Sequence, residues 1–159
     1  MGTARKYQNR IIGRIWLATI LFCLIGLAGC VSPPETAAVV NAIDGDTIII
    51  EGNYRVRYIG IDTPELRPAL EAYGLEAWQA NRELVQNRTV RLERDVSETD
   101  RYGRLLRYVY VDDVFVNAEL VRLGLAEAVA YPPDTRYQDY FEELEAAARK
   151  AGLGIWSKR

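Results

Sequence analysis

The sequence contains no histidine among its 159 residues. This absence removes the commonest general base, the usual ligand of zinc and copper, and every catalytic dyad in which histidine activates serine or cysteine. Acid–base or metal chemistry in this chain must therefore use carboxylates. Carboxylate oxygens suit Ca²⁺ or Mg²⁺ and argue against softer metals.

Cysteine is almost as scarce, since the chain has only Cys23 and Cys30. We expect the rest of the chain to contain no disulfide, no zinc–thiolate site and no thiol nucleophile. Its stability must come from an apolar core. A composition of 49% hydrophobic and 26% charged residues is typical of one globular domain, and no repeat or low-complexity tract interrupts it.

The first 29 residues have the layout of a secretory signal. Four basic residues precede an uncharged apolar run over residues 15–28, which is shorter than the span of about 20 residues that crosses a membrane. Small residues then lead to Cys30 in a pattern that resembles a bacterial lipobox. An uncleaved signal anchor is the alternative.

Three segments follow from this layout. We predict a lipoprotein signal peptide over residues 1–29, a lipidated Cys30 with a proline-stiffened tether over residues 30–37, and a folded domain over residues 38–159. The domain is expected to be exported and anchored to a membrane in the cell envelope, on its periplasmic or extracellular face.

A net positive charge is also lacking. The signal segment holds four of the 20 basic residues and none of the 22 acidic ones, so the remaining chain has a net charge of about −6. This balance argues against a non-specific nucleic-acid coat protein. Any polyanion must be held by a local arrangement of charges.

Hydrophobic periodicity predicts both strands and helices. Strands are expected over residues 37–42, 47–50, 54–61, 89–93 and 106–111, with a short continuation at 114–116. One helix is expected between residues 73 and 87, a short one over 120–123 capped by Asn117, and a last one with Thr135 and Gln138 as a capping box and Gly152 at its end. This order predicts an α+β fold, a five-stranded Greek-key barrel of the OB type flanked by about three helices. An α+β sandwich is the alternative.

Three stretches carry candidate chemistry. They are residues 44–47 (DGDT), 57–65 (RYIGIDTPE) and 100–104 (DRYGR). Each has an ordinary interpretation, because Asp-Gly is a common hairpin turn and Asp-Thr-Pro a common end to a strand. Together, carboxylates at strand ends interleaved with arginines indicate a hard cation held against a phosphate.

In this order the stretches resemble the motifs of the staphylococcal nuclease, or thermonuclease, family. Residues 73–76, 117–121 and 124–126 extend the resemblance, which covers about Val39 to Trp156. The resemblance implies a calcium-dependent endonuclease that hydrolyses phosphodiester bonds of DNA and RNA with little sequence specificity. It also implies products with a 3′-phosphate and a free 5′-hydroxyl.

The resemblance assigns roles residue by residue. It implies that the carboxylates of Asp46 and Asp62 and the carbonyl of Thr63 bind Ca²⁺. It places Arg57 and Arg104 as the catalytic arginines on the scissile phosphate.

Three further positions follow from the same resemblance. Glu65 matches the proposed general base. Tyr102 and Tyr131 match the aromatic residues that flank the bound nucleotide, with a packing role for each ring as the alternative. Asp44 is expected to shape its turn, and the protein to be a monomer.

Two other functions remain open at this level. One is a catalytically silent OB-type module that binds nucleic acid or protein, and the other is a purely structural envelope lipoprotein. The complete set of Asp46, Arg57, Asp62, Glu65 and Arg104 argues against both. The chain departs from the lysine-rich type member of the family, because outside the signal segment its only lysines are Lys150 and Lys158.

Overall fold

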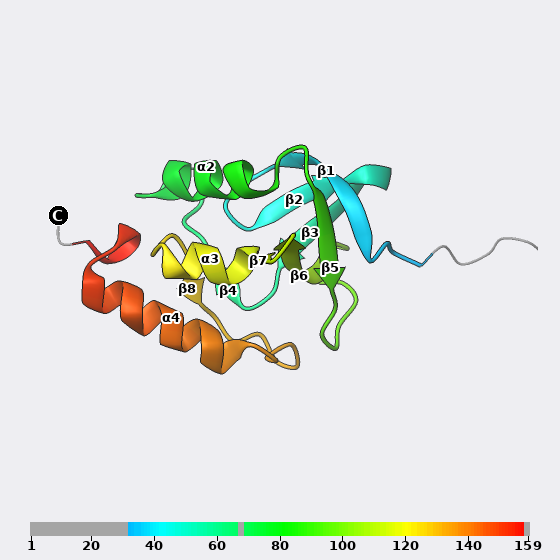
Figure 1. Ribbon diagram of the computed structural model, residues 1–159. Helices are drawn as coiled ribbons and strands as arrows, with labels where there is room; N and C mark the ends of the chain where they lie inside the picture. Colours follow the sequence, from blue (N-terminus) through cyan, green and yellow to red (C-terminus); the bar gives the residue numbers. More distant parts are fainter. Residues whose placement is uncertain (1–31, 67–68, 158–159) are drawn as a thin grey trace, which may run out of the picture. The chain divides into compact units, whose positions relative to one another are not determined.

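Five strands form a closed barrel in the computed structural model, which describes residues 32–66 and 69–157 (Figure 1). They are β1 (Thr36–Ala42), β2 (Thr47–Ile50), β3 (Tyr54–Tyr58), β5 (Thr89–Glu93) and β6 (Leu105–Val111). β1 pairs with β2 and β5, β2 with β3, and β5 with β6, all antiparallel, and a parallel pairing of β3 with β6 closes the barrel. The predicted α+β fold of the OB type is confirmed.

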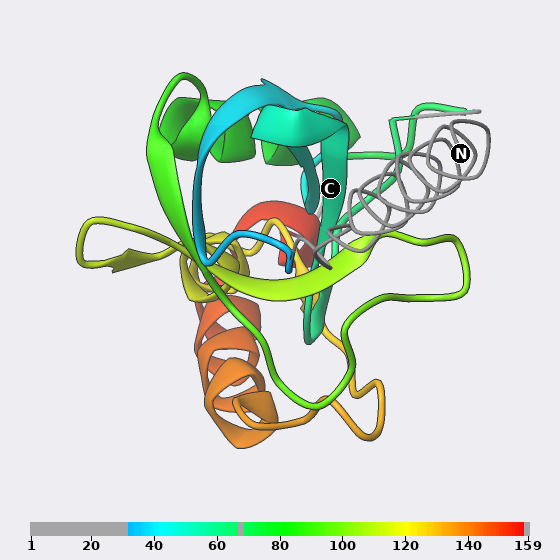
Figure 2. The ribbon, with the colours of Figure 1, turned by 90° about the vertical axis from the view of Figure 1, so that its right-hand side faces the viewer.

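Three α-helices of the described residues flank this barrel, as predicted. α2 (Gly74–Val85) packs on β1, whereas α3 (Val116–Arg122) packs against β6 and α4 (Gln138–Ala151). α2 and α4 lie at opposite sides of the barrel in both views (Figures 1 and 2). No helix within the described ranges is long and apolar enough to cross a membrane. The predicted signal peptide and Cys30 lie outside the described residues.

The barrel interior is filled by one side of each strand. Alternate residues of β2, β3, β5 and β6 point inward because successive side chains of a strand face opposite ways. Each fully buried isoleucine, valine or leucine contributes about 1.5–3 kcal/mol to folding. The most buried of these inward residues include Ile48, Ile50, Val56, Tyr58, Val90, Leu92, Leu105, Val109 and Val111.

The single strand predicted over residues 54–61 was wrong. β3 ends at Tyr58, and a separate strand β4 (Ile61–Asp62) pairs with β8 (Glu127–Ala128), which is too short to show a sequence period. The break occurs at Gly60, whose φ of 79° lies in the left-handed region. A Cβ at Gly60 would lie 2.6 Å from the ring of Phe141 in α4.

Replacement of Gly60 by alanine is expected to lower the free energy of unfolding by about 2 kcal/mol. The positive φ costs an L-residue about 1–2 kcal/mol, and the new methyl group has no room beside the buried Phe141 ring. Urea unfolding measures the change. Gly103 also has a positive φ, of 77°, but open space at its Cβ position, so Gly103→Ala is the matched control and is expected to lose less. Equal losses in the two variants would contradict a role for the Phe141 contact.

Two predicted helix caps were also wrong. α3 begins at Val116 after the N-cap Phe115, so Asn117 lies inside the helix and is fully buried. α4 begins at Gln138 after Tyr137, and no side chain caps it. The side chain of Gln138 instead donates to Glu142 in the next turn. Gly152 ends α4 in the left-handed region, as predicted. The remaining elements are β7 (Val114–Phe115) and the 3₁₀ turns η1 (Glu51–Asn53) and η2 (Gly154–Trp156).

Candidate active site

The turn between β1 and β2 brings Asp46 to the end of β4. The carboxylate of Asp44 accepts a hydrogen bond from the backbone N–H of Asp46 (3.1 Å), which shapes the turn as predicted. The backbone N–H of Thr63 then donates to Oδ2 of Asp46 (3.1 Å). A Cβ at Gly45 would lie 2.6 Å from the Thr63 side chain, so only glycine permits this approach of the two segments.

Arg57 joins the two carboxylates predicted to bind metal. Its guanidinium forms ion pairs with both Asp46 and Asp62, and it also donates to the backbone carbonyl of Ile61 (3.4 Å). Asp46 is buried, whereas the side chain of Asp62 is 49% exposed. The structure therefore brings together Asp46 from the first of the three stretches and Arg57, Asp62 and Thr63 from the second.

Burial and charge act in opposite directions in this cluster. Burial raises the pKa of the Asp46 carboxyl above its usual range, although the Arg57 guanidinium works to lower that pKa. Burial also disfavours the charged guanidinium, but the carboxylates of Asp46 and Asp62 outweigh it and raise the pKa of Arg57. The buried carboxylate thus needs a cation beside it.

Arg104 is held by Asp100, a residue for which the sequence suggested no separate role. Oδ1 of Asp100 accepts from the backbone N–H groups of Tyr102 (2.8 Å) and Arg104 (3.0 Å), and Oδ2 accepts from Nε of Arg104 (2.6 Å). Burial opposes the charge of this carboxylate, but the hydrogen bonds from Arg104 outweigh burial and lower the pKa of Asp100. Because Nε is occupied, the outer end of the Arg104 guanidinium is left to meet a ligand.

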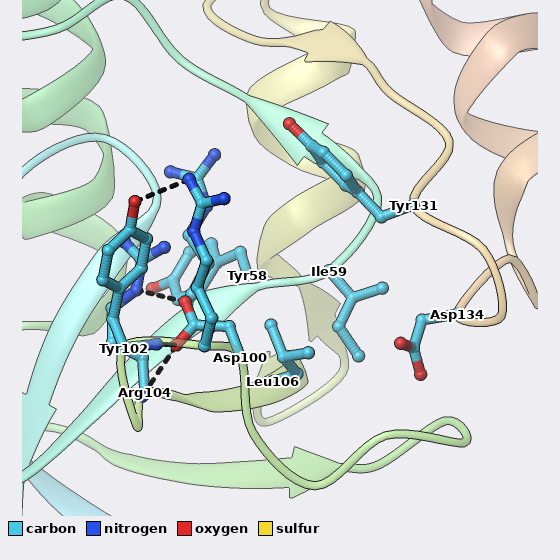
Figure 3. Close-up of a pocket in the computed structure, with 10 residues that line it drawn as sticks. Tyr58, Ile59, Asp100, Tyr102, Arg104, Leu106, Tyr131 and Asp134 are labelled. Carbon is cyan, nitrogen blue, oxygen red and sulfur yellow. Dashed lines mark hydrogen bonds and ion pairs between the residues drawn. The ribbon is translucent and has the colours of Figure 1, made fainter.

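A cavity of about 440 Å³ joins the two arginines to the two predicted tyrosines (Figure 3). Tyr102 and Tyr131 extend from separate loops on opposite sides of the cavity in this view. Their exposed fractions are 68% and 47%, so both rings are accessible to a ligand. Arg57, Arg104, Tyr102 and Tyr131 all line this one cavity, which has the arginines and aromatic faces that a nucleotide requires.

Asp134 forms another wall of the cavity and was missed by the sequence analysis. It is buried, and its Oδ1 accepts from the backbone N–H groups of Val96 (2.9 Å) and Ser97 (2.7 Å). Its own backbone N–H donates to the carbonyl of Tyr131 (2.9 Å). Asp134 thus ties the turn that carries Tyr131 to the loop before β6.

Glu65 lies outside this cavity, as do the predicted metal ligands Asp46, Asp62 and Thr63. It is exposed and lines a neighbouring hollow with Asp44, and its backbone N–H donates to Oε2 of Glu71 (3.0 Å). No hydrogen bond or ion pair within the described ranges joins its side chain to Arg57 or Arg104. Partial desolvation and the nearby Asp44 carboxylate raise the pKa of Glu65.

The atoms predicted to coordinate a metal beside Asp46 are all oxygen atoms. The described residues contain no group of three or more carboxylate, cysteine or histidine side chains placed to share a metal ion. Two carboxylates, Asp46 and Asp62, nevertheless flank one guanidinium, that of Arg57, and the backbone of Thr63 adjoins Asp46. A hard cation that also accepts carbonyl and water ligands fits this set, whereas a softer metal does not.

Fold and site together define an OB-fold protein with a carboxylate–arginine centre and an aromatic-lined cavity on its barrel. The family model described as "Staphylococcal nuclease homologue" matches residues 55–158. The chain is 41% identical over 130 residues to the thermonuclease of Staphylococcus intermedius, which covers 78% of this chain and 77% of that protein. It is 44% identical over 126 residues to endonuclease YncB of Bacillus subtilis, covering 74% and 60% respectively.

A third relative extends the comparison over more of the chain. An uncharacterized endonuclease of Haemophilus influenzae is 33% identical over 148 residues, covering 91% of this chain and 79% of that protein. The chain belongs to the staphylococcal nuclease family. The predicted resemblance is confirmed.

Proposed function

We propose that this protein is a calcium-dependent endonuclease that hydrolyses phosphodiester bonds of DNA and RNA with little sequence specificity. The observation that carries the proposal is the convergence of Asp46 and Asp62 on Arg57, beside a cavity that also holds Arg104. Relatives named as thermonuclease and endonuclease support the same activity. A binding module without catalysis has no need of this whole set.

The arginines account for recognition of the phosphate. Arg57 and Arg104 line one cavity, and their planar guanidinium groups suit bidentate contact with phosphoryl oxygens. Such contacts strengthen as negative charge develops on those oxygens in the transition state. Asp100 acts as a positioning residue because it fixes Nε of Arg104.

The carboxylates and tyrosines complete the proposed site. Asp46, Asp62 and the Thr63 carbonyl would hold Ca²⁺, which supplies polarisation of the phosphate and neutralisation of its charge when bound. Glu65, whose raised pKa favours proton uptake, takes the proton of the attacking water. Tyr102 and Tyr131 stack against the flanking nucleotide, an interaction that tolerates any base.

The proposed location is the cell envelope, with Cys30 lipidated and the domain tethered to a membrane. Support for this location comes from the order of basic run, apolar run and small residues before Cys30. Metabolic labelling with a fatty acid tests the assignment. Incorporation into the unaltered chain but not into Cys30→Ser is the expected result, and equal incorporation would contradict it.

The activity is tested with the purified full chain in mild detergent. Cleavage of single-stranded DNA and RNA is expected in Ca²⁺ and not in a chelator. Equal cleavage in chelator would overturn the metal mechanism. The absence of cleavage under every condition would favour a silent binding module.

Asp62→Asn is expected to raise the Ca²⁺ concentration needed for half-maximal activity about tenfold, because one of two charged ligands becomes neutral. Titration of the initial rate with Ca²⁺ measures the shift. Arg57 keeps its ion pair with Asp46, so the variant does not leave the buried guanidinium without a partner. Asp112→Asn is the matched control, since that aspartate is 80% exposed in the turn after β6. A shift of the same size in the control would contradict the assignment of Asp62.

A further inference from the structure

Arg55 differs from most arginines of the described residues in having no partner. Seven others outside the site form ion pairs with glutamate or aspartate, and two lie over aromatic rings. Arg55 is exposed and forms no hydrogen bond, ion pair or ring contact with the described part of the chain. Its charge is therefore available to a ligand.

The strand β3 places Arg55 on the same face as Arg57. Val56, between them, is fully buried inside the barrel, so both arginines point outward. Residues two apart on a strand are separated by about 6.6 Å. One nucleotide of an extended single strand spans a similar length.

The pairing of β3 with β6 also places Arg55 beside Arg104. Val56 lies opposite Leu105 in this parallel pair, so one step back along each chain brings Arg55 level with Arg104. Leu105 is buried, and Arg104 therefore points outward as Arg55 does. Arg55 thus lies next to both arginines of the proposed site, on the outer face of the paired strands β3 and β6.

No neighbouring carboxylate of the described residues compensates the charge of Arg55, in contrast to Arg57 and Arg104. Arg57 is compensated by Asp46 and Asp62, and Arg104 by Asp100. A nucleic-acid strand carries one phosphate for every nucleotide, and in an acidic domain with few lysines its other phosphates need a local cation. An uncompensated guanidinium next to the cavity meets this need.

We infer that Arg55 binds the phosphate next to the one held by Arg57 and Arg104. This subsite rests on the proposed function and extends it, since it makes the protein favour a polynucleotide over a minimal substrate. A contact with the phosphate adds affinity for any base sequence. It also makes binding more sensitive to salt, because each neutralised phosphate releases counterions.

The test measures binding of the full chain to a fluorescent single-stranded DNA of about twelve nucleotides, in chelator so that no cleavage occurs. Arg55→Ala is expected to raise Kd about fivefold and to reduce the slope of log K against log salt by about 0.7. Arg55→Lys keeps the charge and is expected to keep the slope. Because Arg55 has no partner in the described fold, neither variant removes an internal contact.

Arg88→Ala is the matched control, since it removes the same charge from an exposed arginine. Arg88 pairs with Asp112, which follows the end of β6, whereas Arg104 precedes its start. Arg104 and Asp112, the partner of Arg88, are therefore about 25 Å apart along that strand. Equal effects of Arg88→Ala and Arg55→Ala would show that net charge alone matters and would overturn the subsite. An unchanged slope in Arg55→Ala, or no binding by the unaltered chain, would also overturn it.

Hydrolysis in Ca²⁺ separates this inference from the proposed function. The ratio of kcat/KM for a long strand to that for a dinucleotide is expected to fall about fivefold in Arg55→Ala. If the unaltered chain cleaves neither substrate, the proposed function fails, and the binding measurement in chelator still decides on Arg55. A ratio that does not change would overturn the subsite while leaving the nuclease proposal intact.

Discussion

Arg57→Lys is expected to lower kcat for single-stranded DNA at least a hundredfold. One guanidinium contacts both Asp46 and Asp62 and also lines the cavity that holds Arg104. An ammonium group is a single point charge, which cannot bridge two carboxylates and also grip a phosphate with a planar fork. Loss of one donor to developing charge commonly costs a hundredfold or more. Single-turnover cleavage at saturating Ca²⁺ measures the chemical step.

Lysine tests the catalytic role of Arg57 more directly than alanine does. Alanine would leave the buried Asp46 without its cation, which typically destabilises a protein by about 3–5 kcal/mol and confuses lost chemistry with lost folding. Arg91→Lys is the matched control, because Arg91 pairs with Glu93 on β5 and lines no part of the cavity. A kcat for Arg57→Lys within fivefold of the unaltered chain would remove Arg57 from the proposed catalytic set.

Asn117→Ala is expected to lower the free energy of unfolding by about 2–6 kcal/mol. The buried side chain accepts from the backbone N–H of Val109 (2.9 Å) and donates to the backbone carbonyl of Ile59 (2.9 Å). Alanine leaves both buried groups without a partner, at about 1–3 kcal/mol each. Urea unfolding followed by circular dichroism measures the loss.

Asn41→Ala is the control for this second substitution. Asn41 lies on β1 and is exposed, so its replacement is expected to change the free energy of unfolding by less than about 0.5 kcal/mol. A loss below about 1 kcal/mol in Asn117→Ala would show that the two backbone groups find other partners.

Asn117 also shows a contact that local sequence patterns do not predict. Its position before an apolar run predicted a helix cap, because such a cap needs only local spacing. One of its two actual partners, the backbone carbonyl of Ile59, is 58 residues away. A contact of that kind depends on how the barrel brings β3 to α3. No period in the sequence encodes it.

Local periodicity was enough for the barrel and for the three described helices. Inward and outward residues alternate along β2, β3, β5 and β6, and this alternation sets their faces. The break at Gly60 was missed because the apolar pattern continues from Tyr58 through Ile61 while the backbone turns. The two-residue strand β8 is too short to show any period.

The candidate residues could be predicted from motifs, but not the way in which they are arranged. Asp46, Arg57, Asp62 and Thr63 do meet, and Arg104, Tyr102 and Tyr131 share a cavity with Arg57. The positioning role of Asp100 depends on the shape of a turn, and the separate hollow of Glu65 depends on the path after Pro64. Side-chain direction in loops follows from tertiary contacts rather than from spacing.

The parallel pairing of β3 with β6 also has a kinetic meaning. The hairpins that join β1 to β2 and β2 to β3 link residues close in sequence, whereas Val56 and Leu105 are almost fifty positions apart. Closing so long a loop carries an entropic cost that near neighbours do not incur, and such distant contacts slow folding. Arg57 lies on β3 and Arg104 directly before β6, so this pairing brings the two arginines together. Recovery of phosphodiester cleavage after dilution from denaturant therefore times the closing of the barrel rather than the formation of its hairpins.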